Sequence, residues 1–249
     1  MTLQPTGKPQ NGVSSNNAFV LNFGSVLENA FQKGYTVSLF GPVGAGKTIF
    51  CENMARCFLN GGAECVYIST ERTPADVRID LAILKVNVDK LEAQRKLTFV
   101  DGYSWLVGSS AETYRVENLA NLSELTATIE KACADLDHDE LVILDSVSPL
   151  CLYNPEEDVT KFLQLFAAKN KGRAAIGITV VQEGVHSSKF YNTLAYTVDG
   201  MFDLRKDEEG SEIKRYFRIR NLRSCAHSAE WIPFTIESDR DFKLENRPT

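Results

Sequence analysis

Short apolar runs alternate along the chain with longer segments in which apolar residues recur every three or four positions. The apolar runs cover residues 35–40, 65–69, 96–100, 141–145 and 174–181. Runs of this length are typical of strands that are buried on both faces of a parallel sheet. The helical pattern covers residues 48–60, 74–86, 121–136 and 156–171. Strands that alternate with helices predict an α/β fold, with a mainly parallel twisted sheet and helices on both faces.

The C-terminal part of the chain has a different pattern. Strand-like runs at residues 201–205 and 213–220 flank a polar turn at 207–211, and a further strand-like run covers 231–236. Two strands around a polar turn predict a β-hairpin. We therefore expect an antiparallel extension at the C-terminal end of the parallel sheet.

The N-terminal part differs from both. Residues 1–17 are rich in Asn, Ser, Gly, Pro and Gln, which predicts a flexible arm. Residues 25–31 can form a short helix, and residues 105–118 have weak periodicity and predict a loop. Because the sequence has no internal repeat and no long linker, we expect a single domain over residues 18–249.

The first apolar run leads directly into a glycine-rich segment that matches the phosphate-loop pattern G-x-x-x-x-G-K-[ST]. The segment is Gly41-Pro42-Val43-Gly44-Ala45-Gly46-Lys47-Thr48. Glycines allow the main chain to curl so that successive N–H groups point at phosphate oxygens. The helix that follows adds its free N–H groups and the positive end of its dipole. Lys47 can reach the β- and γ-phosphates of a nucleotide, and the Thr48 hydroxyl can ligate Mg²⁺.

Other polar residues follow the strands whose carboxyl ends should meet at the same edge of the sheet, where ligands bind in open α/β sheets. Asp145 ends an apolar strand and could hold Mg²⁺, usually through water. Glu71 could orient or deprotonate the water that attacks the γ-phosphate. Gln182 and Glu183 could sense the γ-phosphate by hydrogen bonding. The alternatives are a turn cap at Asp145, a surface carboxylate at Glu71 and plain loop positions at 182 and 183.

Composition narrows the function class. The chain has 249 residues and a formal net charge of −6, which argues against a dedicated nucleic-acid coat. Its six cysteines form no C-x-x-C pair and several lie in apolar runs, so reduced core cysteines are favoured over a metal site or disulfides. The N-terminus lacks the apolar section of a signal peptide, and no apolar run is long enough to span a bilayer. These features predict a cytoplasmic protein without membrane insertion.

Several motifs taken together resemble the KaiC-like family of RecA-like P-loop ATPases, in particular its archaeal single-domain members. Besides the phosphate loop, the resemblance covers Ile68–Pro74, Phe99–Ser104, Leu144–Ser148 and Leu222–His227, and it extends over about residues 19–242. It implies a RecA-like fold, ATP and Mg²⁺ as cofactors, and a hexameric ring with ATP held between neighbouring subunits. By this resemblance Leu222, Arg223 and His227 approach the nucleotide of the adjacent subunit. Without it, the arginines of this segment would be assigned to a solvated hairpin.

Two positions depart from the family pattern. The family often has a second glutamate after the second strand, where this chain has Arg72, and a lysine where it has Asn221. The loss of a carboxylate and of a cation from the neighbour predicts slow hydrolysis, or ATP used as a switching ligand.

Three functions fit these features. The first is a slow Mg-dependent ATPase that regulates a protein partner through ATP-dependent self-association. The second is a recombination accessory protein similar to archaeal RecA relatives, which would bind single-stranded DNA through residues 184–191. The third is a non-catalytic ATP-binding partner of a motor such as the archaellum assembly apparatus.

Overall fold

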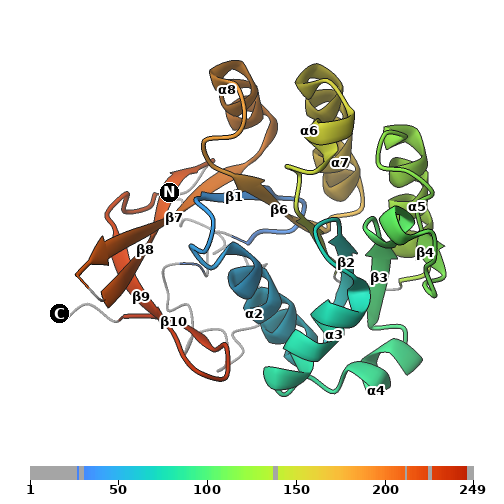
Figure 1. Cartoon of the computed structure of the whole chain (residues 1–249), viewed down its shortest axis with the longest axis horizontal. Coiled ribbons are helices and arrows are strands. Elements are labelled where there is room, and N and C mark those ends of the chain that lie inside the picture. The colour runs from blue at the N-terminus through green and yellow to red at the C-terminus, as the bar shows by residue number, and fades with distance from the viewer. Residues whose placement is uncertain (1–26, 28–30, 137–139, 211, 224–225, 246–249) are drawn as a thin grey trace, which may run out of the picture.

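The computed structural model describes residues 27, 31–136, 140–210, 212–223 and 226–245. In these residues all the strands belong to one ten-stranded sheet with the order β10-β9-β8-β7-β1-β6-β5-β2-β3-β4 (Figure 1). The predicted arm at 1–17 and most of the predicted helix at 25–31 lie outside the described residues.

Seven neighbouring strands run parallel, from β7 through β1 to β4. They are β1 (Thr36–Gly41), β2 (Glu64–Ser69), β3 (Leu97–Asp101), β4 (Tyr114–Arg115), β5 (Glu140–Asp145), β6 (Ile176–Gln182) and β7 (Gly200–Glu209). Three antiparallel strands extend the sheet beyond β7. They are β8 (Glu212–Leu222), β9 (Ile232–Ile236) and β10 (Phe242–Leu244). The predicted mainly parallel sheet and its C-terminal hairpin extension are therefore confirmed.

Helices cover both faces of the sheet (Figure 1). On one face lie α2 (Lys47–Asn60), α3 (Pro74–Ile83) and α4 (Val88–Ala93), and on the other α5 (Leu122–Ala134), α6 (Leu150–Tyr153), α7 (Glu156–Gly172) and α8 (Ser188–Thr197). Successive strand residues point into different cores: Leu39 belongs to the cluster under α2, and Phe40 to the cluster under α7 and α8. This arrangement explains the nearly continuous apolar runs of the sequence, because both faces of each central strand are buried.

The structure corrects several predicted boundaries. The helix predicted for 74–86 ends at Ile83, and a separate helix, α4, follows a turn in which Lys85 has φ 64°. The predicted loop 105–118 contains β4 and most of a short 3₁₀ helix, Ser104–Val107. The hairpin strands are longer than predicted, because the charged residues 207–209 continue β7 instead of forming a turn. This end of the strand is charged and contains ion pairs such as Lys206–Glu208, so no apolar pattern in the sequence indicates that the strand continues.

No helix in the described parts of the chain is both long enough and apolar enough to cross a bilayer.

Candidate functional site

The phosphate-loop segment connects the carboxyl end of β1 to the first turn of α2, as its sequence predicts. Gly44 and Gly46 have φ values of 75° and 101°, a region that L side chains rarely adopt. At Gly41 a Cβ atom would lie 2.7 Å from the main-chain oxygen of Leu204 on β7. Glycine is therefore required at 44 and 46 by conformation, and at 41 by the close approach of the neighbouring strand.

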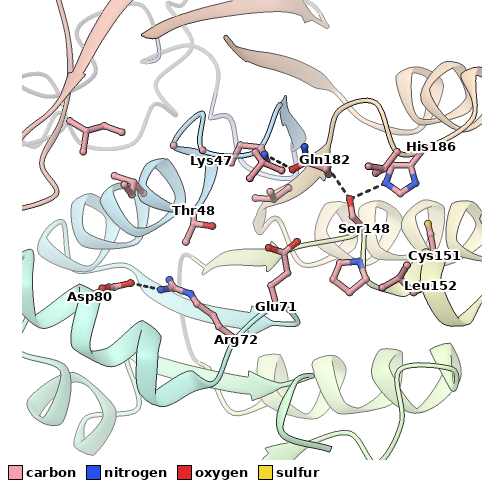
Figure 2. Close-up of a pocket in the computed structure, with 18 of the residues that line it drawn as sticks. Lys47, Thr48, Glu71, Arg72, Asp80, Ser148, Cys151, Leu152, Gln182 and His186 are labelled. Carbon is pink, nitrogen blue, oxygen red and sulfur yellow. Dashed lines mark hydrogen bonds and ion pairs between the residues drawn. The ribbon is translucent and has the colours of Figure 1, made fainter. Parts of the chain in front are cut away.

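Lys47 folds back over this loop. Its ammonium donates to the main-chain oxygens of Gly41 and Pro42, both at 2.8 Å, and to Gln182 Oε1 at 2.9 Å (Figure 2). Burial lowers the pKa of Lys47, while the nearby carboxylates, Glu71 first among them, oppose that shift. The structure thus brings the predicted sensor Gln182 directly to the predicted phosphate-binding lysine.

Asp145 lies at the end of β5 beneath the first turn of α2. Its carboxylate accepts hydrogen bonds from the Thr48 hydroxyl at 3.3 Å and the Tyr67 hydroxyl at 2.7 Å. Burial raises the pKa of Asp145, and the hydrogen bond from Tyr67 opposes the rise. The donor set of Thr48 and Asp145, a hydroxyl and a carboxylate, fits Mg²⁺, which prefers oxygen ligands. The sequence did not single out Tyr67, because nothing in an apolar strand marks which aromatic residue carries a polar contact.

Glu71 follows β2, which pairs with β5 so that Ser69 lies opposite Asp145. The Ser146 hydroxyl donates to the Glu71 carboxylate. Ser146 is itself held by Thr70, because its main-chain N–H donates to the Thr70 hydroxyl oxygen at 2.7 Å. The peptide bond between Asp145 and Ser146 is cis. The pairing of two adjacent strands therefore sets Glu71 beside the end of β5.

A cavity of about 740 Å³ joins these groups. Gly44, Gly46, Lys47, Thr48, Glu71 and Gln182 line it, together with Val43. Two predicted site residues do not line the cavity: Asp145, which is buried, and Glu183, which is exposed. The cavity also has lining residues that the sequence analysis missed. They are Ser148, Glu156 and His186, together with Arg215 of β8, Ile236 of β9 and Arg240 between β9 and β10. The functional roles of all these residues remain predictions.

Arg72, at the first departure from the family pattern, turns away from Glu71 toward α3 (Figure 2). Its guanidinium pairs with Glu52 of α2 and with Asp80 of α3. Arg240 pairs with the same two carboxylates, at 2.7 Å from Glu52 and 3.0 Å from Asp80. Two arginines and two carboxylates thus form a charge-balanced network at the edge of the cavity, around a Glu52 side chain with 0% exposure.

None of the three residues assigned to a neighbour's nucleotide lines this cavity. Leu222 pairs with Gly200, which pairs with Val37 near the amino end of β1. The Arg223 main-chain N–H donates to the Asp199 oxygen at 2.8 Å, and its guanidinium lies 3.5 Å from the Asp199 carboxylate. His227 is partly buried in the segment between β8 and β9, which is described from residue 226 onward. Leu222 and Arg223 therefore lie near the amino ends of the parallel strands, whereas the phosphate loop lies at the carboxyl end of β1.

Comparisons with known proteins agree with this geometry. The family model of the KaiC ATPase matches residues 18–243. UPF0273 proteins of Thermotoga maritima and Pyrococcus furiosus are 28% and 29% identical to the chain; each match covers 85% of this chain, and 88% and 86% of the respective relative. The crystal structure of a KaiC-like protein from Pyrococcus horikoshii superimposes with a TM-score of 0.70 at 22% identity, over 90% of this chain and 95% of the other, and shows the same fold. The chain belongs to the KaiC family of ATPases, and it is an ATP-binding protein with a RecA-like fold.

Proposed function

We propose that the chain binds Mg·ATP in the cavity beside the phosphate loop, hydrolyses it slowly, and uses the bound state to control its own self-association. The observation that carries the proposal is the convergence of Lys47, Thr48, Glu71 and Gln182 on one cavity, with Asp145 directly behind Thr48. Four separate strand ends supply these groups, and no packing requirement explains why all of them are polar.

Each residue has a role that its present contacts support. The Lys47 ammonium donates to two main-chain oxygens and to Gln182 Oε1, and phosphate oxygens can replace the two main-chain acceptors. Thr48 and Asp145 would hold Mg²⁺, which supplies charge neutralisation at the phosphates when it is bound. Glu71, whose carboxylate accepts a hydrogen bond from Ser146, would orient the attacking water.

Slow hydrolysis and self-association rest on further features. Arg72 removes the second carboxylate of the family pattern, and its charge is taken up by Glu52 and Asp80. Arg223 lies at the edge of the sheet opposite the phosphate loop, so it cannot serve the nucleotide of its own chain. A head-to-tail assembly, hexameric by family resemblance, would bring these two edges together and place Arg223 and His227 beside a neighbour's nucleotide. Such an assembly responds to ATP, and a regulatory protein partner could recognise it.

The test is ATP turnover measured together with mass in solution, with and without Mg·ATP. Lys47→Ala should abolish both nucleotide binding and ATP-dependent association. Glu71→Gln should keep binding and association while turnover falls by about 10²-fold or more, as expected for loss of a catalytic base. Turnover that survives Lys47→Ala unchanged would place the ATPase site elsewhere.

The single-stranded DNA alternative draws little support from the segment that would carry it. Phe190 is 2% exposed and packs on His186, and the Tyr191 hydroxyl donates to the main-chain oxygen of Gln182 at 2.9 Å. Lys189 is paired with Glu157 at 2.7 Å. Because both aromatic residues pack inward, stacking on bases would require the segment to rearrange. The motor-partner alternative predicts ATP binding without turnover, and the same assay separates it from the main proposal.

A further inference from the structure

A serine, a histidine and a carboxylate form a chain of contacts in the wall of the cavity, outside the groups used above. The Ser148 hydroxyl lies 2.9 Å from His186 Nε2 (Figure 2), and His186 Nδ1 lies 3.5 Å from Glu156 Oε1. The His186 side chain is 3% exposed. Its ring packs against Phe190 at 4.6 Å and Tyr191 at 5.8 Å between ring centroids. These residues come from α7, α8 and the segments that follow β5 and β6, so no single sequence motif marks them.

The direction of the hydrogen bonds follows from the partners. Glu156 as a carboxylate can only accept, so Nδ1 of His186 carries a proton. Burial lowers the pKa of His186, and Glu156 opposes that shift, so the ring is neutral near pH 7. A neutral ring with a proton on Nδ1 has an accepting Nε2, and the Ser148 hydroxyl therefore donates to it.

The same Ser148 oxygen accepts the main-chain N–H of Gln182 at 2.9 Å. The Gln182 main-chain oxygen accepts from the Tyr191 hydroxyl, and its side chain accepts from Lys47. Gln182 is thus fixed at its N–H, its main-chain oxygen and its side chain. Two of these three attachments, through Ser148 and Tyr191, depend on residues that contact the His186 ring.

We propose that His186 is a positioning residue for ATP hydrolysis: through the Ser148 hydroxyl it fixes Gln182, and with it the Lys47 ammonium, at the γ-phosphate end of the cavity. This inference rests on the proposed function. Serine–histidine–carboxylate contacts also occur in hydrolases, where the serine is the nucleophile. Here the Ser148 oxygen accepts from the main-chain N–H of Gln182, and the Ser148 hydroxyl donates to His186. Both hydrogen bonds of Ser148 therefore help to position Gln182.

Protonation gives the proposal a specific signature. A charged ring donates from both nitrogens and no longer accepts from Ser148. Among the described residues, the titratable groups in contact with the ring are Glu156 on α7 and Tyr191 on α8, and Cys151 on α6 and Glu71 line the same cavity. Because the pKa of His186 lies below its ordinary value of about 6.5, the contact persists at neutral pH and is lost as the pH falls through the lowered pKa.

Two variants at this position separate hydrogen bonding from packing. His186→Phe keeps a ring against Phe190 and Tyr191 but removes both nitrogens. His186→Gln supplies an acceptor and a donor and does not titrate. For both, kcat and KM for ATP are measured between about pH 5.5 and 8, together with the ratio of the Kd values for ADP and ATP.

We expect His186→Phe to lower kcat about tenfold at pH 8 with KM within about twofold, which is the loss of one well-aligned hydrogen bond. The preference for ATP over ADP should fall by a similar factor, and this readout does not require turnover. His186→Gln should recover most of both losses. His186→Gln should also lack the part of the acidic decline in kcat that protonation of His186 causes in the wild-type protein.

Wild-type values of kcat and of the ADP-to-ATP ratio in His186→Phe would overturn the inference, as would the same acidic decline in His186→Gln as in the wild type. Transfer of radiolabel from the γ-phosphate of ATP to Ser148, absent in Ser148→Ala, would also overturn it by making the serine a nucleophile. Lys47→Ala, run alongside, tests the proposed function itself. Nucleotide binding lost in Lys47→Ala but unaffected kinetics in His186→Phe would reject only the role of His186.

Discussion

At the scale of single residues, Arg72 shows how a charge that departs from a family pattern is accommodated. Glu52 has an exposed side-chain fraction of 0%, and Arg72 and Arg240 are its partners. Burial still raises the pKa of Glu52, with both arginines opposing the shift. When a fully buried carboxylate loses one of its two cationic partners, its desolvation penalty is no longer fully offset, and the folded state is destabilised.

We therefore expect Arg72→Gln to lower the free energy of unfolding by about 2 kcal/mol. Arg78→Gln is the matched control: Arg78 is similarly exposed, and it pairs with Glu92 and Glu112, which are both partly exposed. Its loss should cost less than about 1 kcal/mol. Urea unfolding of both variants measures the difference, and equal losses would contradict the role given to the buried Glu52.

Glu140, at the start of β5, gives a second residue-scale prediction. Burial raises the pKa of Glu140 to about 7; Arg173 opposes this rise and Glu64 adds to it. A carboxyl with a raised pKa in the folded state contributes stability below its unfolded pKa, about 4.5, and that contribution is lost as the pH rises through about 7. Glu140→Gln should therefore stabilise the protein at pH 8 and not at pH 5. Because the side chain is only partly buried, solvent screening limits the gain to about 1 kcal/mol. Thermal unfolding at the two pH values checks this, and an equal effect at both would exclude titration as the cause.

The site residues that the sequence predicts belong to a local motif or follow a strand, and those that it misses are brought together by packing between distant segments. Lys47 and Thr48 are fixed by a local motif, and Asp145, Glu71 and Gln182 each follow an apolar strand, so the parallel sheet brings them to one edge. Ser148 and His186 meet only because two connecting segments pack against α7 and α8. That packing depends on contacts distant in sequence, and no spacing rule records it.

At the scale of elements, the central strands were predictable because burial on both faces leaves an unbroken apolar run. The division between α3 and α4 was not, because the pattern of Val77, Leu81, Leu84, Val86 and Val88 continues across it; all five are buried in the same core. The turn is imposed by the left-handed conformation of Lys85, a residue that gives no turn signal. The strand β10 was missed because it has three residues, too few for any periodicity.

Two glycines test how closely these elements pack. At Gly177 of β6, a Cβ atom would lie 2.5 Å from Asn170 Nδ2 and 2.6 Å from Thr36 Oγ1, both in buried side chains. Gly177→Ala should lower the free energy of unfolding by about 1–3 kcal/mol through overpacking. Gly172→Ala is the control, because a Cβ atom there meets nothing within 4 Å at the end of α7. Alanine should be neutral or stabilise that helix by about 0.5 kcal/mol. Denaturant unfolding compares the two, and a neutral Gly177→Ala would mean that α7 can shift away from the sheet.

At the scale of the whole molecule, the phosphate loop and Arg223 lie at opposite ends of the parallel strands. The phosphate loop lies at the carboxyl end of β1, and Arg223 lies beyond the register pair Gly200–Leu222 at the amino end. If Arg223 acts on a nucleotide, that nucleotide belongs to another copy of the chain. Complementation of two inactive variants tests whether Arg223 acts on the nucleotide of another chain or on that of its own chain.

Lys47→Ala lacks a working phosphate loop but presents an intact Arg223, and Arg223→Ala has the reverse. Each variant alone should have low turnover. In an equimolar mixture, contacts that join an intact phosphate loop to an intact Arg223 can form, because the loop of Arg223→Ala still binds nucleotide, and turnover should rise above the mean of the two separate variants. Because Arg223 is partly exposed and its pair with Asp199 spans 3.5 Å, its replacement should leave the fold intact, which thermal unfolding verifies. A mixture whose turnover equals the mean would show that the two edges never meet, and the ATPase would then have to work within single chains.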